Sequence, residues 1–379
     1  MMTGTIEIPH SIRDALRAVF GRPIGSPLDD SAFDRLALAI FAWQFEHNTP
    51  YAAYCSRRGR TPAAVTHWTQ IPAVPTAAFR EAALIAGDPA AAAAVFRTSG
   101  TTGGPERRGT HYIGDTSLYH ESLLPNFAAM LLPDGAAPVM ISLVPRPAEV
   151  PDSSLSHMVE TVIARFGAPA STWVASVVSG IDDARLNRAL HEACERDEAV
   201  CLLGTSFAFI HWLDVLRATG RRYALPPGSR IMDTGGFKGR SREVDADAMR
   251  EEYAFRLGID TVHGVNEYGM TEMCSQFYDS TLRDHAAGLK RSRHKVIPPW
   301  VRTRLVDADT LEPVTQGERG LLQHFDLANA GSVCAIQTED VGEAIEGGFR
   351  VIGRAAGAQP RGCSMAMDDL LEALAGNRP

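Results

Sequence analysis

The arrangement of hydrophobic and polar residues predicts alternating strands and helices in the middle of the chain. Short runs rich in Val, Ile and Leu are typical of buried strands, at Ala137–Val144, Val200–Gly204, Arg230–Asp233 and Asp260–Gly264. Beside them, hydrophobic residues recur with helical spacing at Ser154–Arg165, Asp182–Cys194, Phe207–Thr219 and Val244–Leu257. Strands that alternate with helices of this length favour a parallel sheet with crossover helices.

The two ends of the chain have different patterns. The region up to Leu84 is mostly helical in character. From Arg302 the pattern changes to short strand-like segments with glycine turns, at Thr303–Val306, Gly320–Phe325, Val333–Gln337 and Phe349–Ile352. One more helix is predicted at Met365–Ala375. We therefore expect an α/β protein with a large domain at 1–352, a β-rich subdomain within it at 302–352, and a C-terminal remnant at 353–379.

The composition limits the classes of protein to which the chain can belong. The chain has 379 residues, of which 45% are hydrophobic and 22% charged, with a formal net charge of −8. This acidity argues against nucleic acid as a partner, since phosphate binding needs a basic surface. The first residues lack a signal-peptide pattern and no apolar run is long enough to span a membrane, so a cytoplasmic protein is expected. The six cysteines are scattered, which favours neither disulfides nor a zinc site.

A glycine-rich loop carries the first candidate chemistry. Residues 98–105 read Thr-Ser-Gly-Thr-Thr-Gly-Gly-Pro and follow an apolar run. Glycines let backbone N–H groups turn toward an anion, and hydroxyls add further donors to phosphate oxygens. The loop is not a Walker A motif, because Gly-Lys-Ser/Thr is missing. A Ser/Thr/Gly surface turn remains the alternative for this segment taken alone.

Three more segments follow in order. Residues 233–239 read Asp-Thr-Gly-Gly-Phe-Lys-Gly at the end of a predicted strand, where α/β proteins bind ligands. Residues 268–272 read Tyr-Gly-Met-Thr-Glu, which offers a carboxylate as a hard oxygen ligand for Mg²⁺. Asp340 ends a Thr-Glu-Asp segment and Arg354 follows it; a carboxylate can accept hydrogen bonds from two hydroxyl groups.

In this order, the four segments resemble those of the acyl-adenylating superfamily, which includes acyl-CoA ligases, adenylation domains and luciferases. The resemblance implies an adenylate-forming fold that uses ATP and Mg²⁺. It assigns Thr271 to the α-phosphate, Glu272 to the metal, and Tyr268 with Gly269 to the adenine. It places Asp340 and Arg354 at the ribose. The remaining nucleotide-binding positions that it implies are Thr98, Ser99, Gly100, Thr101, Thr102, Gly103, Gly235 and Gly236. Two departures from the pattern are Glu106, which precedes the basic Arg107 and Arg108, and Glu339, where a glycine is usual.

Within the superfamily the chain resembles the LuxE-type acyl-protein synthetases over nearly its whole length. Stretches that carry this resemblance include residues 153–158, 203–209, 275–279 and 361–364. These proteins pass the activated acyl group to a cysteine thiol, and Cys363 matches that position. Ser364 as helix cap and the nearby helix N-terminus predict a lowered pKa for this thiol, while Gly357 and Gly362 predict freedom of the tail. A packing cysteine is the alternative.

The lysines bear on catalysis as well. Full-length relatives carry a mobile C-terminal domain with a catalytic lysine, whereas the lysines here are Lys238, Lys290 and Lys295. The resemblance therefore implies that this domain is absent or reduced to a remnant, unless a partner supplies it. Lys238, in the Gly-Gly turn, is a candidate replacement cation near the phosphates. A solvated turn residue is the equal alternative.

The expected function is adenylation of a fatty or aromatic carboxylic acid with MgATP, followed by transfer to a thiol. The acceptor is Cys363 itself, a partner protein such as an acyltransferase or reductase, or coenzyme A. A carrier protein or an amine is a further alternative. The alternative from a different functional class is a non-catalytic protein that binds a nucleotide or an acyl group. Thr271, Glu272 and Asp340 argue against this alternative, because a protein that only binds does not need Mg²⁺ at the α-phosphate.

Overall fold

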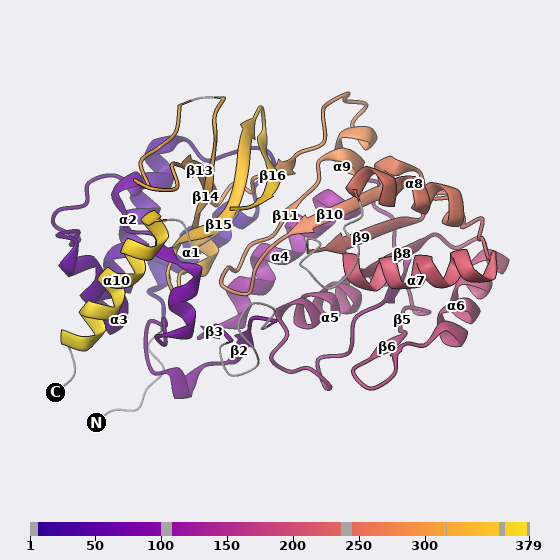
Figure 1. Cartoon of the computed structure of the whole chain (residues 1–379), viewed down its shortest axis with the longest axis horizontal. Helices are drawn as coiled ribbons and strands as arrows, with labels where there is room; N and C mark the ends of the chain where they lie inside the picture. Colours follow the sequence, from indigo (N-terminus) through magenta and orange to yellow (C-terminus); the bar gives the residue numbers. More distant parts are fainter. Residues whose placement is uncertain (1–6, 100–107, 236–244, 316, 356–360, 377–379) are drawn as a thin grey trace. The chain divides into compact units, whose positions relative to one another are not determined.

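The computed structural model of this protein describes residues 7–99, 108–235, 245–315, 317–355 and 361–376. Contacts within the chain divide it into two compact units, whose elements are drawn in Figure 1. The unit that we call the antiparallel-sheet unit comprises Met1–Pro125, Met270–Ser275 and Lys295–Pro379. The parallel-sheet unit comprises Asn126–Gly269 and Gln276–His294.

The parallel-sheet unit is built on a sheet with the strand order β11-β10-β9-β8-β4-β5. Neighbouring strands from β5 to β10 are parallel, whereas β11 pairs with β10 in the antiparallel sense. The parallel sheet predicted from the sequence is therefore confirmed. The strands are β4 (Val139–Ser142), β5 (Thr172–Trp173), β8 (Val200–Thr205), β9 (Arg230–Thr234), β10 (Gly264–Tyr268) and β11 (Phe277–Tyr278).

Amphipathic helices connect these strands, as the hydrophobic spacing predicts. They are α5 (Ser154–Phe166), α6 (Asp183–Glu195), α7 (Ser206–Thr219) and α8 (Ala246–Leu257). Each has an N-cap side chain that accepts a backbone N–H bond, namely Ser153, Asp182, Thr205 and Asp245. Their apolar faces and the sheet share one core, to which Phe209, Trp212 and Tyr253 contribute. The unit also contains a small hairpin of β6 (Ala175–Ser176) and β7 (Gly180–Ile181), and the helix α9 (Thr281–Ala286).

The strand predicted at Asp260–Gly264 is displaced along the chain. The carboxylate of Asp260 accepts the N–H of Val262 at 3.0 Å and starts a 3₁₀ turn, η5 (Thr261–His263). The strand β10 begins only at Gly264 and runs to Tyr268. The prediction was wrong because a polar cap can divert an apolar β-branched run into a turn. As a result, Tyr268 lies at the carboxyl end of a strand.

The antiparallel-sheet unit contains the strand order β12-β16-β15-β14-β13, with β1 added parallel to β15. Each strand-like segment predicted between 303 and 352 overlaps a strand of this sheet, although β15 starts at Ala335 instead of the predicted Val333 and continues to Ile345. The bounds are β1 (Val74–Pro75), β12 (Lys295–Val296), β13 (Val301–Val306), β14 (Arg319–Asp326), β15 (Ala335–Ile345) and β16 (Gly348–Arg354). Its N-terminal helices, also predicted, are α1 (His10–Phe20), α2 (Asp30–His47) and α3 (Thr49–Arg57). A hairpin of β2 (Ala94–Arg97) and β3 (Thr110–Ile113) precedes α4 (Thr116–Leu131).

The last helix, α10 (Arg361–Gly376), starts four residues before the predicted Met365. Ser364 therefore lies inside the helix and is not its N-cap, which corrects the prediction. Figure 1 shows α10, in yellow, beside α3. Ion pairs join these two helices: Arg58 lies 2.9 Å from Asp369, and Arg57 pairs with both Asp369 and Glu372.

Candidate active site

The base of the glycine-rich loop is closed by hydrogen bonds between β2 and β3. The Thr98 N–H donates to the Gly109 carbonyl at 2.9 Å, and the Gly109 N–H donates to the Thr98 hydroxyl oxygen at 2.9 Å. The Arg108 guanidinium donates to the carbonyls of Arg97 and Thr98. Thr98 and Arg108 thus brace the loop at its base. Ser99 is exposed, and the predicted Gly100, Thr101, Thr102 and Gly103 lie outside the described residues.

The Gly-Gly turn follows β9, as predicted. Gly235 has a φ of 88°, which favours glycine, and no heavy atom would lie within 4 Å of a Cβ there. The Ser206 hydroxyl, in the first turn of α7, donates to the Gly235 carbonyl at 3.0 Å. This bond ties the turn to the start of a helix at the carboxyl end of the sheet. Gly236 and Lys238 lie outside the described residues, so Lys238 stays a prediction.

The Tyr-Gly pair lies on the neighbouring strand, next to that turn. Glu267 of β10 pairs in register with Thr234 of β9, and the Thr234 hydroxyl donates to the Glu267 carboxylate. The ring of Tyr268 lies 5.9 Å from that of Phe277. A Cβ at Gly269 would lie 2.2 Å from a Glu267 carboxylate oxygen, so glycine there leaves room for this buried carboxylate. The fold therefore brings Gly235, Tyr268 and Gly269 to adjacent strand ends.

Thr271 and Glu272 belong to the antiparallel-sheet unit, since the chain passes from one unit to the other after Gly269. Glu272 is only 7% exposed, and its carbonyl oxygen accepts an N–H from the Asn329 side chain at 2.9 Å. The Thr271 carbonyl accepts from the His111 ring at 2.7 Å. Among the described residues, no group of three or more His, Cys, Asp or Glu side chains is arranged to hold a metal. A metal here would need oxygen ligands from the substrate, as Mg²⁺ commonly takes from phosphates.

The two predicted ribose-binding residues are cross-strand neighbours. Asp340 of β15 pairs in register with Arg354 of β16, and the Arg354 guanidinium lies 3.5 Å from the Asp340 carboxylate. Arg354 also approaches Glu339 at 3.9 Å, the residue that replaces the usual glycine. The Asp340 N–H donates to the Thr338 hydroxyl at 3.1 Å. The sequence prediction that Asp340 and Arg354 act together therefore has a geometric basis.

Cys363 lies in the same unit, but its environment contradicts the predicted lowering of its pKa. It is 1% exposed and packs with Val306 and Leu321. Burial, with a smaller contribution from the Glu339 carboxylate, raises its pKa to about 11. The predicted lowering was wrong, because desolvation of the thiolate outweighs the helix N-terminus. Gly362 does not loosen the tail either: its N–H donates to the Ala308 carbonyl at 2.9 Å, and a Cβ there would lie 2.7 Å from Leu311. Gly357 lies outside the described residues.

One position that supports the candidate site was missed in the sequence, although it lies inside a quoted segment. Asp233 is buried and accepts the Tyr253 hydroxyl at 3.1 Å and the Asn266 amide at 2.5 Å. These bonds join the carboxyl half of β9 to the helix α8 and to β10, close in the chain to Gly235 and Tyr268. A polar residue within a buried, otherwise apolar strand is the pattern that would have indicated Asp233.

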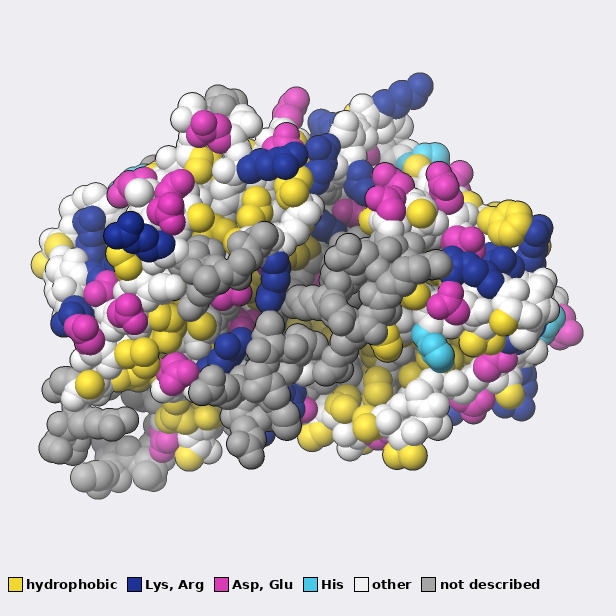
Figure 2. Space-filling model, in the orientation of Figure 1, with side chains coloured by type: hydrophobic (Ala, Val, Ile, Leu, Met, Phe, Trp, Pro, Cys, Tyr) yellow, Lys and Arg dark blue, Asp and Glu magenta, His cyan; other side chains and the backbone are white. Residues whose placement is uncertain are grey.

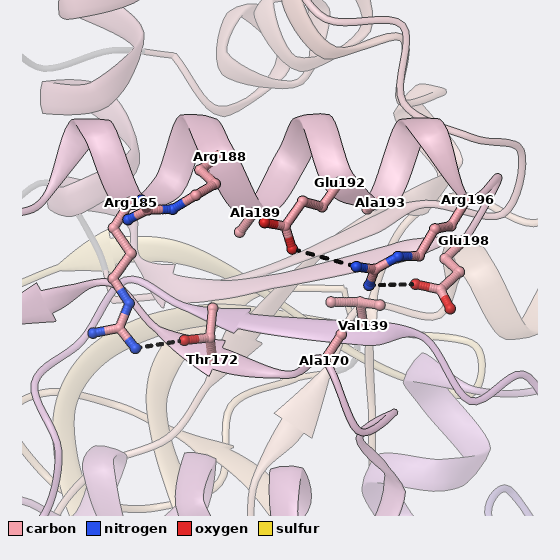
Figure 3. Close-up of a pocket in the computed structure, with 10 residues that line it drawn as sticks. All are labelled: Val139, Ala170, Thr172, Arg185, Arg188, Ala189, Glu192, Ala193, Arg196 and Glu198. Atoms are coloured by element: carbon pink, nitrogen blue, oxygen red, sulfur yellow. Dashed lines mark hydrogen bonds and ion pairs between the residues drawn. The ribbon is translucent and has the colours of Figure 1, made fainter.

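A cavity of about 180 Å³ in the parallel-sheet unit contains none of the predicted site residues (Figure 3). It lies beside α6, and its charged side chains are largely paired with one another. Arg196 lies 3.6 Å from Glu192 and 3.9 Å from Glu198, and Arg185 donates to Thr172 at 2.9 Å. Charges of both signs are interspersed over the face drawn in Figure 2, which agrees with the mixed, slightly acidic composition.

The fold is that of the adenylate-forming acyl-CoA ligases. A crystal structure of 2-hydroxyisobutyryl-CoA ligase in an open conformation, bound to 2-HIB-AMP and CoA, matches with a TM-score of 0.62 and 16% identity, over 88% of this chain and 77% of that one. The same enzyme in the postadenylation state matches with a TM-score of 0.61 and 15% identity, over 93% of this chain and 73% of that one. At such identities the likeness concerns the fold alone.

The chain belongs to the LuxE acyl-protein synthetase family, whose sequence profile matches residues 176–372. It is similar to the long-chain-fatty-acid–luciferin-component ligase of Vibrio harveyi, with 20% identity over 81% of this chain and 78% of that protein. The ligase of the same name from Aliivibrio fischeri is 23% identical over 38% of this chain and 36% of its own length. The protein is therefore a ligase of the acyl-protein synthetase type. Within the described part of the chain, no helix combines the length and apolar character needed to cross a membrane.

Proposed function

We propose that this protein activates a fatty acid with ATP and passes the acyl group to a thiol. In the first step a carboxylate oxygen of the acid attacks the α-phosphorus of ATP, and pyrophosphate leaves. In the second step a thiolate attacks the acyl carbon of the acyl-adenylate, AMP leaves, and a thioester forms. ATP use and a fatty acid substrate are implied by the family. A long chain is suggested by the names of the relatives, and an aromatic acid is the alternative.

The observation that carries the proposal is the pairing of β9 with β10. It aligns Thr234 with Glu267, so the Gly-Gly turn and the Tyr-Gly pair leave the sheet from adjacent parallel strands. Nucleotides bind beyond the carboxyl ends of such strands, where backbone and aromatic surfaces are accessible. We assign Gly235, Gly236, Tyr268 and Gly269 to the adenine.

Polar contacts with the nucleotide are assigned to further residues in this proposal. The loop from Thr98 to Gly103 and the Thr271 hydroxyl bind phosphate oxygens, and Glu272 binds Mg²⁺ together with those oxygens. Asp340 and Arg354 bind the ribose, with the carboxylate accepting its hydroxyl protons. Residues 1–352 then form the adenylate-forming body and 353–379 a remnant that carries Cys363. Lys238 remains the candidate cation for the leaving pyrophosphate.

Acid-dependent exchange of labelled pyrophosphate into ATP tests the first step. We expect exchange with fatty acids in a panel that also contains aromatic acids, and dependence on Mg²⁺. Glu272→Ala and the equally sized Glu272→Gln should lose roughly a thousandfold in rate, since a metal ligand beside the reacting phosphate supplies several kcal/mol. Background exchange across the whole panel would exclude adenylation. Normal exchange in both variants would exclude only the role of Glu272.

The second step has two candidate acceptors. Intact mass after incubation with ATP and acid, before and after neutral hydroxylamine, detects a thioester on the protein. The adduct should disappear in Cys363→Ser while pyrophosphate exchange persists. Transfer to an external thiol or amine is the second candidate, favoured by the burial of Cys363. Pyrophosphate exchange without any adduct on the protein would indicate an external acceptor.

A further inference from the structure

A buried polar cluster in the antiparallel-sheet unit fixes the backbone of the Thr271–Ser275 segment. The cluster consists of His111, Asp326 and Asn329, each at most 1% exposed. Asp326 accepts the N–H of Cys274 at 3.0 Å and the hydroxyl of Ser275 at 2.6 Å. His111 and Asn329 bind the carbonyls of Thr271 and Glu272. Four of the five residues of this short, non-helical segment are therefore held, through a backbone or side-chain group, by side chains distant in the sequence.

His111 connects Thr271 to the strand that leaves the glycine-rich loop. It lies on β3 and pairs in register with Phe96 of β2, the strand that leads into the loop. Burial lowers the pKa of His111 to about 4, so the ring is neutral at pH 7 and has one N–H. The Nδ1 atom lies 2.7 Å from the Thr271 carbonyl oxygen, a shorter distance than the 3.1 Å between Nε2 and the Asn329 side-chain oxygen. Both of these oxygens are acceptors, so the neutral ring can donate to only one of them; we assign the proton to Nδ1, which has the shorter contact and donates to Thr271.

Asn329 holds the next residue. Its Nδ2 donates at 2.9 Å to the Glu272 carbonyl and at 2.9 Å to the Val333 carbonyl, which uses both amide protons. Gln44 binds the backbone of the same turn but not the Asn329 side chain: its Nε2 donates at 3.0 Å to the carbonyls of Asn329 and Ala330. The Asn329 amide can thus bind Glu272 in one orientation only, because both of its donors have carbonyl partners.

We propose that His111 and Asn329 are positioning residues for adenylation, which hold Thr271 and Glu272 in the orientation that the reaction requires. The proposal rests on the proposed function, because it assumes that the Thr271 hydroxyl and the Glu272 carboxylate act on bound MgATP. Neither positioning residue contacts the nucleotide in this account. Each fixes a peptide carbonyl, and the rotation of that peptide sets the direction of the reactive side chain. Displacements of about 1 Å at a reacting group cost on the order of a hundredfold in rate.

The test uses two variants and one matched control. His111→Phe keeps a ring of similar size, which preserves the edge-on contact with Phe79, and removes both nitrogens. Asn329→Leu removes both N–H donors. Gln44→Leu is the control: it removes a similarly buried amide that binds the same turn, but contacts neither Thr271 nor Glu272. His111→Phe and Asn329→Leu are both made so that the proposal can still be tested if one of them fails to fold.

The expected result is a separation of rate from binding. His111→Phe and Asn329→Leu should lower pyrophosphate exchange at saturating ATP by about ten- to a hundredfold, with the KM for the acid unchanged. The Mg²⁺ concentration for half-maximal exchange should rise in Asn329→Leu. Calorimetry with a non-hydrolysable ATP analogue should show that Mg²⁺ tightens binding less in this variant than in the wild type. Gln44→Leu should lose thermal stability and keep the wild-type kcat and Mg²⁺ dependence.

Hydrogen exchange provides a readout independent of activity. Amides of residues 270–275 should exchange faster in His111→Phe and Asn329→Leu than in Gln44→Leu. Normal kcat in folded His111→Phe and Asn329→Leu would overturn the proposal while leaving the proposed function intact. An equal loss of kcat in Gln44→Leu would overturn it as well, since the effect would then be general destabilisation. Background exchange in the wild type would instead overturn the proposed function, and the catalytic role of both residues with it.

Discussion

The thiol of Cys363 donates to the carbonyl oxygen of Thr338, with a sulfur–oxygen distance of 3.9 Å. Thr338 lies two residues before Asp340 on β15, so the predicted acyl carrier and the predicted ribose ligand lie on contacting elements of one unit. With α10 docked, however, the sulfur is enclosed by apolar side chains. The thiol is therefore close to the predicted nucleotide site but protected, and acylation at Cys363 requires that α10 move.

The first prediction concerns the reactivity of that thiol. Because burial raises the pKa of Cys363 to about 11, the thiolate fraction at pH 8 is on the order of one in a thousand. Iodoacetamide should label Cys363 slowly at pH 8 and faster as the pH rises toward 11, as followed by mass spectrometry of peptides. The half-buried Cys194 is the internal control and should react first. Labelling of Cys363 at the rate of Cys194 at pH 8 would show that α10 is not docked in solution.

The second prediction concerns the ion pairs between α3 and α10. Arg57→Ala together with Arg58→Ala removes the pairs to Asp369 and Glu372. Partly exposed pairs contribute about 0–1 kcal/mol each, so we expect Cys363 labelling to accelerate by roughly fivefold. Arg17→Ala is the matched control, since it removes the pair to Glu121 elsewhere on the same unit. An unchanged labelling rate in the double variant would mean that apolar packing alone holds α10.

The third prediction concerns ribose binding. Asp340→Ala should weaken binding of a non-hydrolysable ATP analogue by about 2–4 kcal/mol, the usual range for two charge-assisted hydrogen bonds. Calorimetry should show a much smaller effect on binding of the acid. The control is Glu343→Ala, which removes a carboxylate from the same strand; Glu343 pairs with Arg350 of β16 just as Asp340 pairs with Arg354. Equal nucleotide affinity in the two folded variants would show that Asp340 has only a structural role.

The fourth prediction concerns stability in acid. Burial lowers the pKa of His324 to about 3 in the folded state, so between pH 6.5 and 3 the unfolded chain binds a proton that the folded chain does not. Stability therefore falls as the pH decreases, by about 2 kcal/mol for this residue between pH 7 and pH 5. His324→Phe should show a smaller shift in urea midpoint between these two pH values.

The carboxyl group of Asp326 changes stability with pH in the opposite direction to His324. Burial raises the pKa of its carboxyl group to about 6, so the folded chain binds this proton before the unfolded chain as the pH decreases. This carboxyl group therefore partly offsets the acid destabilisation. Asp326→Asn should enlarge the midpoint shift between pH 7 and pH 5, whereas His324→Phe reduces it. Shifts of the same direction in the two variants would contradict at least one of the two assignments.

Several features were predictable because they depend on local physics. The central helices are fixed by apolar spacing and polar caps, as at Ser153 and Thr205, and the strands β8 and β9 by short apolar runs. A parallel sheet follows from the alternation of these elements. The order of the glycine-rich loop, Gly235, Tyr268 and Glu272 resembles that of adenylate-forming ligases. Each helix, strand or motif is made of residues within a few positions of one another, and their order can be read directly from the chain.

The errors occurred where one local rule opposed another. At Asp260 a side-chain cap prevailed over a β-branched run, and β10 starts later than predicted. At the C-terminus, Ser364 matched an N-cap, yet Cys363, Ala366, Met367 and Leu370 form one buried helical stripe, so the helix begins earlier and the cysteine turns inward. That spacing was present in the sequence, but which residues a helix buries depends on the surface it meets.

What the sequence determined alone is the class of fold, the set of candidate site residues and their order along the chain. Only the tertiary structure decided the pKa direction at Cys363, because desolvation depends on packing against Val306 and Leu321 rather than on the helix that carries it. The same holds for the support of Thr271 and Glu272 by His111 and Asn329, which lie 160 and 57 residues away in the chain. A hydrogen bond over such a separation forms only when the fold has brought both partners together, and no local pattern encodes it.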